Sequence, residues 1–541
     1  AVALVGVLVA LGLSQLVTTA PMGQRWIPCG LLLLAAALAW AAAVTARAGA
    51  LQVFVRPLML ALVVAGLLST LVAGLQVFAP EFTGNALVAY PTIAGRAVGN
   101  MRQPNQLSTL LLWAMGAAVW VGLQARGREE ADGAKKGMAR WHLTAGLLAL
   151  LTVGVLWTSS RTGMVGMALL ALWGLLDRRL PAPLRWVMVL GLPLLYALGW
   201  WGMEQWSAST GQFFYGDDQV KKTLHGDPSS SRGRIWANTL ALIAQHPWVG
   251  VGPGAYNFVW SLTPFAGRPV AFFDHSHNLP MQLAVESGLP FAIAVVLGLC
   301  WAFWRSRAGL WQADQARPAG VRAAWFMLAV VGVHSLLEYP LWYAYFLLPA
   351  AMLAGWACSG APSEVPPHTG PGRLVRRCVA GVGALSVALS LWALQQYYTV
   401  AVIFDPALAI GEPEQLPERI ARGRRSVFFG HHADYALVTM AERPGPLLAQ
   451  FERPLYHLLD TRLMMAYARA LAERGDLLRA RDVAARLREF RNPASQAFFA
   501  ECDEPERTRP VPFQCGDDPQ LSADALRPAA VQAVPVVRNP P

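Results

Sequence analysis

The chain has 541 residues, of which 55% are hydrophobic and only 14% are charged, with a formal net charge of +11. Soluble domains usually carry about 25% charged residues, so the composition is that of a membrane protein. The positive charge does not predict nucleic-acid binding, because the basic residues are distributed over short loops between apolar segments.

Apolar segments recur along the chain, and most are long enough to cross the hydrocarbon core of a bilayer as a helix. About eleven are predicted, at 1–18, 26–46, 57–79, 106–125, 142–159, 163–176, 184–203, 288–304, 323–339, 341–358 and 378–398. We expect the first to be a retained span rather than a cleaved signal peptide. The predicted fold class is therefore an all-α polytopic membrane protein with about 11 transmembrane helices.

The basic residues fall in alternate loops, which is the positive-inside pattern of cytoplasmic loops. They are Arg47, Arg56, Arg126, Arg128, Lys135, Lys136, Arg140, Arg178, Arg179, Arg185, Arg305, Arg307, Arg317, Arg322, Arg373, Arg376 and Arg377. The intervening loops before residue 204 hold only Arg25, Arg96, Arg102 and Arg161. The pattern predicts a cytoplasmic N-terminus, and an outer face that carries the C-terminus and the long polar loop.

Four parts follow along the sequence: spans one to seven in 1–203, a polar outer loop in 204–287, spans eight to eleven in 288–400, and a helical outer tail in 401–541. Within the tail, Met464–Phe490 has the pattern of two amphipathic helices, which is compatible with one tetratricopeptide-type hairpin or with a small helical cap. The Pro-rich end from Arg509 onward is predicted to be extended or disordered. Cys502 and Cys515 lie in the tail, where both the paired and the unpaired state remain open.

The sequence predicts neither a nucleotide-binding loop nor a metal site. The glycines at Gly250, Gly252 and Gly254 lack the spacing of a phosphate-binding loop and predict a tight turn after a helix that ends near His246. His275 and His277 are two residues apart, but no third and fourth ligand at metal-site spacing accompanies them. No metal is therefore expected.

Every polar cluster falls on the predicted outer face. The clusters are Gly99–Gln106, Ser159–Gly163, Ser229–Arg234, Phe272–Gly288, and the group His334, Glu338 and Tyr339. They are spread over more than two hundred residues of sequence but share one membrane level, so we expect a polar site there.

Two sets of arginines are candidate anion ligands. Arg161 stands between two apolar segments, where a charged residue is costly and a functional pairing is the default hypothesis; the alternative is an arginine that reaches out to lipid headgroups. Arg232 and Arg234 precede a predicted helix at about 235–245, which Ser229–Ser231 can cap. A capped helix start with two arginines suits a phosphate or diphosphate, although a solvated charge pair is an equal alternative.

His277 is the candidate catalytic residue. Asn278 can cap a helix whose first turn tolerates Pro280, so that His277 stands just before the helix start. A histidine there can accept a proton from a hydroxyl near neutral pH, and Asp274 or Glu286 could orient it. A structural histidine is the alternative interpretation, and the neighbouring His275 is a second candidate for the same role.

Five short motifs, in this order and on one face, resemble the O-antigen ligase/polymerase superfamily. They are Gln103-Pro104-Asn105 before an early span, Ser160-Arg161-Thr162-Gly163 at an outer turn, Arg232-Gly233-Arg234-Ile235-Trp236 in the long loop, His277-Asn278-Leu279-Pro280-Met281-Gln282 closing it, and the sequence from His334 to Pro349. The last motif and the helical tail look most like the bacterial protein O-oligosaccharyltransferase branch, the pilin glycosylases. The resemblance covers about residues 1–400.

The resemblance implies a GT-C-like glycosyltransferase of the bacterial inner membrane, with its active site and C-terminus in the periplasm. Such an enzyme would transfer a preassembled glycan from undecaprenyl diphosphate to an acceptor hydroxyl, without a metal or another cofactor. The implied partners are the lipid-linked glycan, membrane lipid, and a pilin-like acceptor protein or lipid A core, and no nucleic acid.

The resemblance also assigns roles to residues of this sequence. His277 corresponds to the acceptor-activating residue, while Arg161 and Arg234 correspond to diphosphate ligands. The remaining substrate-binding candidates are Arg102, Gln103, Asn105, Gln106, Arg232, His275, Asn278, Glu338 and Tyr339.

Other functions remain as alternatives. Within the same chemistry, the acceptor could be lipid A core, as in a ligase, or another glycan, as in a polymerase. A transporter is less expected, because ionisable groups in the predicted spans gather at one end rather than at mid-membrane. A non-enzymatic scaffold would retain its function when His277 is replaced.

Overall fold

The structure is a computed structural model that describes residues 1–17, 20–47, 52–85, 87–126, 134–216, 231–307, 316–359, 373–411, 414–457, 459–502 and 511–528. Of the residues named above, Arg128, Ser229, Ser230 and Arg509 lie outside these ranges, as do the side chains of Arg126, Lys135, Lys136, Arg140 and Arg317. Within the described residues every regular element is helical. The predicted all-α class is therefore confirmed.

Each of the eleven predicted spans contains an apolar helix. The helices are α1 (Val2–Ser14), α2 (Met22–Arg47), α3 (Gln52–Phe78), α4 (Pro104–Arg126), α5 (Ala134–Trp157), α6 (Arg161–Leu176), the continuous run of α7 (Ala182–Trp186), the π-helical turn η2 (Val187–Gly191) and α8 (Leu192–Thr210), then α13 (Leu289–Ser306), α15 (Ala316–Ser335), α16 (Ala344–Ala357) and α17 (Arg373–Phe404). Six of these stretches, at Gly23–Arg47, Val55–Phe78, Pro104–Gln124, Ala182–Thr210, Leu289–Ser306 and Arg376–Phe404, are long and apolar enough to cross a membrane; the other five are shorter. The protein is thus a polytopic helical membrane protein, and the count of eleven spans stays a prediction.

The remaining helices lie between α8 and α13 and after α17. They are α10 (Arg232–Gln245), α11 (Tyr256–Leu262), α12 (Leu279–Ser287), α18 (Leu416–Gly423), α19 (Gly430–Met440), α20 (Glu452–Leu455), α21 (Thr461–Glu473), α22 (Leu477–Glu489) and α23 (Gln496–Phe499). Short 3-10 turns are η1 (Pro80–Phe82), η3 (Pro340–Trp342), η4 (Pro406–Leu408), η5 (Gly445–Phe451), η6 (Pro493–Ser495), η7 (Ala500–Cys502), η8 (Phe513–Cys515) and η9 (Ala523–Leu526).

The chain forms two compact units. Unit 1 comprises Ala1–Val7, Ala35–Pro228 and Gly298–Val379, and unit 2 comprises Leu8–Leu34, Ser229–Leu297 and Ala380–Pro541. Unit 2 therefore joins most of the predicted polar loop to the tail. The four predicted parts were defined along the sequence rather than by compactness, so that division stays a prediction.

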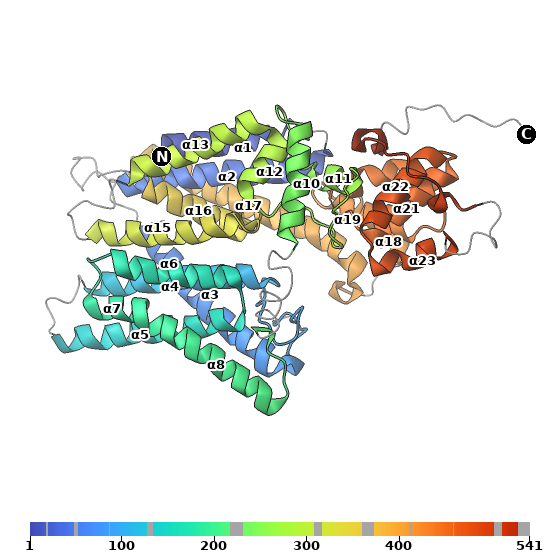
Figure 1. Ribbon diagram of the computed structural model, residues 1–541. Coiled ribbons are helices and arrows are strands. Elements are labelled where there is room, and N and C mark those ends of the chain that lie inside the picture. Colours follow the sequence, from blue (N-terminus) through green and yellow to red (C-terminus); the bar gives the residue numbers. More distant parts are fainter. Residues whose placement is uncertain are drawn as a thin grey trace, which may run out of the picture. The chain divides into compact units, whose positions relative to one another are not determined.

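In unit 1, α4 is the central helix. It packs against α3, α5, α6 and α15, and Figure 1 shows α3 to α6 side by side. Within Pro104–Gln124, 78% of the most apolar 18-residue stretch is buried. Such burial fits a helix that is apolar all round. Glycines let α6 approach α4 closely: a Cβ on Gly166 would lie 2.1 Å from a methyl carbon of Leu112. This packing brings the start of α4 next to the start of α6.

In unit 2, the loop segment and the tail share one hydrophobic core, which includes Trp260 and Val285 from the loop and Phe451, Tyr467 and Phe490 from the tail. The ring of Phe258 stacks on Tyr456 at 5.0 Å, and Phe272 stacks on Phe490 at 3.8 Å. Full burial of such side chains stabilises a fold by roughly 1.5–3 kcal/mol each. The tail therefore supports the loop directly.

The predicted helical hairpin of the tail is confirmed as α21 and α22, which pack against each other. Asp460 caps α21 through the amide of Leu463 at 2.8 Å, and Asp476 caps α22 through the amide of Arg479 at 3.2 Å. Gly475 turns the chain between them with a φ of +81°, which glycine adopts without steric cost. Cys502 and Cys515 form a disulfide.

Candidate active site

Three segments predicted to share a membrane level meet at the start of α4. Asn105 donates a hydrogen bond from Nδ2 to Oε1 of Glu338 at 3.2 Å and accepts one from the Ser160 hydroxyl at 2.6 Å. Asn105 is in the first turn of α4, Ser160 precedes α6, and Glu338 follows α15. The helix packing of unit 1 thus assembles polar groups that are up to 233 residues apart in the sequence.

Arg161 is the first residue of α6, and the residue before it is the N-cap. The Ser160 hydroxyl accepts a hydrogen bond from the amide of Gly163 at 3.0 Å. A Cβ on Gly163 would lie 3.0 Å from the Cβ of Ser108 on α4, so a small residue is needed there. The Ser-Arg-Thr-Gly motif therefore caps α6, holds it against α4 and places an arginine at the helix start, where the N-terminal dipole also favours an anion.

Arg96 is a second arginine in this region. From the sequence, it was used only to assign its loop to one side of the membrane. Arg96 donates from Nε to the carbonyl of Thr158 at 3.0 Å, and its guanidinium lies 4.5 Å from the ring centre of Tyr215. Burial lowers the pKa of Arg96, the negative charge of Glu338 raises it and the positive charge of Arg161 lowers it. Arg96 is thus an electrostatic neighbour of both residues. An arginine in a short loop otherwise poor in basic residues was the signal that could have identified it.

The other candidates of unit 1 differ in their surroundings. Gln103 accepts a hydrogen bond from the amide of Gln106 at 2.6 Å, and Gln106 in turn accepts one from the Tyr345 hydroxyl. Tyr339 stacks on Tyr343 with ring centres 6.1 Å apart. Arg102 is exposed and has a left-handed backbone, with a φ of +56°.

His334, the remaining member of the last polar cluster, accepts a backbone hydrogen bond from the amide of Glu338 at 2.8 Å. It is fully buried, and its Nδ1 is 2.9 Å from the Thr109 hydroxyl. Thr109, one turn after Asn105 on α4, thus holds the ring of His334 within the helix packing.

His277 lies at the start of α12 in unit 2, as predicted. Asn278 caps the helix by accepting from the amide of Met281 at 3.1 Å, and Pro280 lies in the first turn. His277 itself has a φ of +56°, and its ring meets Phe273 edge to face at 5.4 Å. Left-handed backbone is uncommon for a residue other than glycine and gathers at functional sites.

The acidic neighbours of His277 have distinct environments. Asp274 pairs with Nδ1 of His275 at 3.0 Å. Burial alone would raise the pKa of Asp274, but the charge and hydrogen bond of His275, with the charge of His277, lower it to about 2. Asp274 therefore contacts His275 directly and acts on His277 through its charge.

Glu286 is held within a network that the sequence did not reveal. Gln282 accepts from the amide of Ser276 at 2.7 Å and donates to Glu286 at 3.0 Å. Burial raises the pKa of Glu286 to about 7, although the charge of His275 and the hydrogen bond from Gln282 lower it. Gln282, which is buried, fixes the backbone beside His277. The sequence marked Gln282 as the last residue of the motif that begins at His277, but not as a partner of Glu286.

The glycine-rich turn packs on the same helix. The predicted tight turn is confirmed: α10 ends at Gln245, and Gly250, Gly252 and Gly254 all have positive φ. The amide of Gly252 donates to the carbonyl of Glu286 at 2.9 Å. A Cβ on Gly250 would lie 2.4 Å from the backbone of Glu286, so glycine is required for this contact.

Arg232 and Arg234 lie in the first turn of α10, which begins three residues earlier than predicted. The prediction that Ser231 caps this helix is wrong: Ser231 is at the N-cap position, but its backbone is left-handed and its side chain makes no capping hydrogen bond. Arg234 is exposed and Arg232 is half-buried. The indole of Trp236 donates to the carbonyl of Ser276 at 3.0 Å, which ties this helix to the segment that carries His277.

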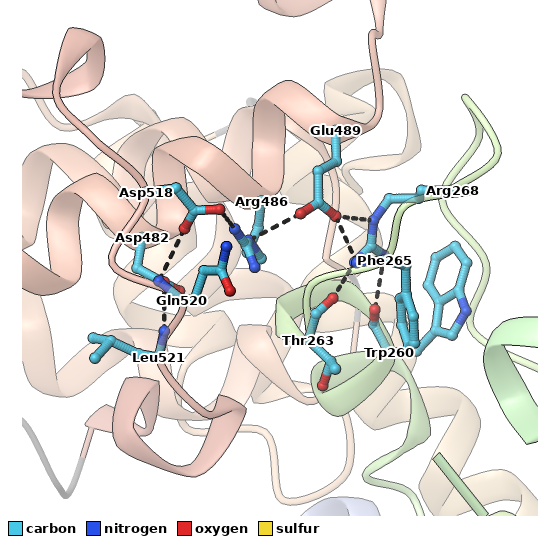
Figure 2. Close-up of polar contacts among 10 residues, drawn as sticks. All are labelled: Trp260, Thr263, Phe265, Arg268, Asp482, Arg486, Glu489, Asp518, Gln520 and Leu521. Carbon is cyan, nitrogen blue, oxygen red and sulfur yellow. Dashed lines mark hydrogen bonds and ion pairs between the residues drawn. The ribbon is translucent and has the colours of Figure 1, made fainter. Parts of the chain in front are cut away.

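A buried ion network connects the loop segment to the tail (Figure 2). Arg268, 1% exposed, donates from Nε to Glu489 at 2.9 Å and from a terminal nitrogen to the carbonyl of Trp260 at 2.7 Å. Glu489 lies 3.3 Å from Arg486, which also pairs with Asp518. No sequence pattern indicated this network, because Arg268 and Glu489 are 221 residues apart.

The fold and these polar groups define a helical membrane protein whose candidate residues form two sets. Arg102, Gln103, Asn105, Gln106, Arg161, Glu338 and Tyr339 are in unit 1, and Arg232, Arg234, His275, His277 and Asn278 are in unit 2.

Three family descriptions match the chain: O-Antigen ligase over residues 146–296, Virulence factor membrane-bound polymerase, C-terminal, over 322–502, and Protein glycosylation ligase over 97–120. Every candidate residue falls within one of these segments.

Two curated relatives from Acinetobacter baylyi are similar to this chain. A general O-oligosaccharyltransferase is 25% identical over 276 residues, which cover 50% of this chain and 45% of the relative. A ComP-specific O-oligosaccharyltransferase is 25% identical over 287 residues, which cover 51% and 46%. The chain spans about half the length of the curated relatives it matches. The resemblance to the O-antigen ligase/polymerase superfamily, and most to its O-oligosaccharyltransferases, is confirmed.

Proposed function

We propose that this protein transfers a preassembled oligosaccharide from undecaprenyl diphosphate to a serine or threonine hydroxyl of an acceptor protein. The observation that carries the proposal is His277, an uncommon left-handed histidine held before a capped helix in the unit that also contains Arg232 and Arg234. The O-oligosaccharyltransferase names of the two relatives support this class of reaction. The proposed site of action is the periplasmic face of the bacterial inner membrane.

In the proposed reaction, the acceptor oxygen attacks the anomeric carbon of the glycan. The bond between that carbon and the diphosphate oxygen breaks, the hydroxyl proton moves to His277, and the lipid diphosphate leaves as an anion. A positioned base contributes about 10²–10⁴-fold to such a step. Holding the lipid-anchored donor and the hydroxyl in contact lowers the barrier further.

The leaving diphosphate needs positive charge, which we assign to Arg161 and Arg234. Guanidinium groups bind phosphate oxygens with paired hydrogen bonds, and electrostatic stabilisation of developing charge supplies much of the rate enhancement in many enzymes. The transfer chemistry would then need no metal. Asn105 and Glu338, which are hydrogen-bonded to each other, would hold the polar surroundings of Arg161 in place.

The acceptor class is tested with purified full chain, a lipid-diphosphate-linked glycan and each acceptor in turn. We expect glycan on serine or threonine of a pilin-like protein, detected by mass spectrometry of the intact acceptor. Transfer to lipid A core or to another glycan, but not to protein, would overturn the proposal in favour of a ligase or a polymerase, the two functions that the matched family descriptions name.

The diphosphate assignment predicts an effect on the donor. Replacing Arg161 or Arg234 with Gln should raise KM for the lipid-linked donor by about tenfold or more, because a charge-assisted hydrogen bond contributes about 1.5–3 kcal/mol. KM for the acceptor should change little. The matched control is Arg422→Gln, whose side chain is in an exposed ion pair with Glu414. Unchanged donor kinetics in both site variants would count against the assignment.

The tail disulfide supports the proposed periplasmic location. Disulfides such as Cys502–Cys515 persist in oxidising compartments and are rare in a reducing cytosol. Labelling of single exposed cysteines in intact cells with a membrane-impermeant reagent tests the orientation. A cysteine introduced in the tail should react, and labelling of the predicted cytoplasmic loops instead would reverse the proposed orientation.

A further inference from the structure

Three histidines of the tail, none of them a residue of the candidate active site, face one another. His431 and His432 begin α19, and His457 follows α20. Their ring centres are 4.3, 4.0 and 4.7 Å apart. One ring nitrogen of each lies within 4.8 Å of the corresponding atoms of the other two. Three nitrogen donors from two chain segments therefore converge on one point.

The first histidine of this cluster is buried without a protein partner for its outer nitrogen. His431 is 6% exposed, and no hydrogen bond within the described residues reaches its Nε2. A buried polar atom without a partner costs roughly 1–3 kcal/mol, so something should occupy this position. His432 is half-buried and His457 is exposed, which leaves a route for an ion from solvent.

A metal binds to neutral imidazole, because that form keeps a lone pair on one ring nitrogen. Each of the three rings can therefore offer one nitrogen to an ion at the point where they converge.

Arg453, whose positive charge acts on His431, shares one carboxylate with Arg424. Arg453 donates from Nε to Asp434 at 2.6 Å, and Arg424 donates to the other oxygen of the same carboxylate at 2.7 Å. Asp434 is consequently occupied and does not act as a partner for the histidines.

We propose that His431, His432 and His457 bind one divalent transition-metal ion of the zinc class, with a water in the fourth position. Zinc takes three histidines and a water at Zn–N distances of about 2.0–2.1 Å, which places nitrogen atoms about 3.4 Å apart in a tetrahedral site. The ligand nitrogens, which lie within 4.8 Å of one another, would need to approach by up to about 1.4 Å. Imidazole ligands suit zinc, copper and nickel rather than magnesium or calcium.

Binding would link α19 to the turn after α20. Both elements pack with η5 in the tail, and α19 also packs with α21, so an ion bound only by the folded chain would stabilise the tail by mass action. None of the three histidines is among the residues to which the transfer chemistry is assigned.

The test uses the full chain in detergent, purified with a tag that contains no histidine, stripped with a chelator and dialysed against micromolar zinc. We expect about one zinc ion per chain by elemental analysis, and a rise of several degrees in the unfolding midpoint. Cobalt should give the visible absorption of a tetrahedral site.

The variants His432→Ala and His457→Ala carry the test, because His432 is half-buried and His457 is exposed, so that their loss should not unfold the tail. Each should lower zinc affinity at least tenfold, whereas His142→Ala, an exposed histidine on α5, should not. Absence of stoichiometric zinc in the wild type, or unchanged affinity in both variants, would overturn the proposal. No donor or acceptor is present, so failure here leaves the proposed transferase function untouched.

Discussion

The backbone of His277 is the most informative feature at the scale of single residues. The sequence predicted the cap at Asn278 and the proline in the first turn, because both are local preferences of helix starts. It did not predict the left-handed conformation of His277, which the Ser276–Gln282 hydrogen bond and the contact with Phe273 hold in place. Such strain persists only where the surroundings determine it.

Glu286 gives a pH-dependent prediction. Its pKa of about 7 in the folded chain is above the ordinary value of 4.5, so the folded state binds this proton more tightly than the unfolded state. The stabilisation is fully present below pH 4.5 and is lost as the pH rises through 7. Glu286→Gln should remove this component, so that the unfolding midpoint of the variant falls less than that of the wild type between about pH 5 and 8. Parallel pH profiles of the two proteins would contradict the assignment.

At the scale of elements, the approach of α6 to α4 places Arg161 beside Asn105. Gly166→Ala should push these helices apart, because the new Cβ would lie 2.1 Å from Leu112, and overpacking costs about 1–3 kcal/mol. Gly146→Ala on α5 is the matched control: it gives the same gain in helix propensity, but nothing lies within 4 Å of its Cβ. Thermal unfolding in detergent should show a lower midpoint for Gly166→Ala alone. Equal midpoints would mean that this helix contact is not tight.

The ion network between the loop segment and the tail makes a second prediction at this scale. Glu489→Ala leaves Arg268 and Arg486 buried without their shared carboxylate (Figure 2), and loss of one partner from a buried pair costs about 3–5 kcal/mol. Arg422→Ala, which breaks an exposed pair with Glu414, should cost at most about 1 kcal/mol. Thermal unfolding of both variants in detergent measures the difference.

A double variant checks the physical reason. Arg268→Met with Glu489→Leu should be more stable than Glu489→Ala, because it also removes the Arg268 charge that Glu489→Ala leaves buried without a carboxylate. A double variant that is less stable than the single variant would show that the network contributes through more than charge pairing.

At the scale of the whole molecule, the sequence predicted what depends on local composition. All eleven apolar segments contain helices, since length and hydrophobicity are properties of one stretch of chain. The common core of the loop segment and the tail could not be predicted, because contacts such as Phe272 with Phe490 join positions far apart in the sequence. The same limit hid Arg96 and Arg268, whose partners are 62 and 221 residues away.

The most direct test is turnover by purified His277→Ala with a lipid-diphosphate-linked glycan and a protein acceptor. If His277 takes the acceptor proton, kcat should fall at least about 100-fold, while the unfolding midpoint stays close to that of the wild type. His142→Ala should retain full activity. Retention of wild-type kcat by a folded His277→Ala protein would contradict the proposed role of His277 in oligosaccharide transfer.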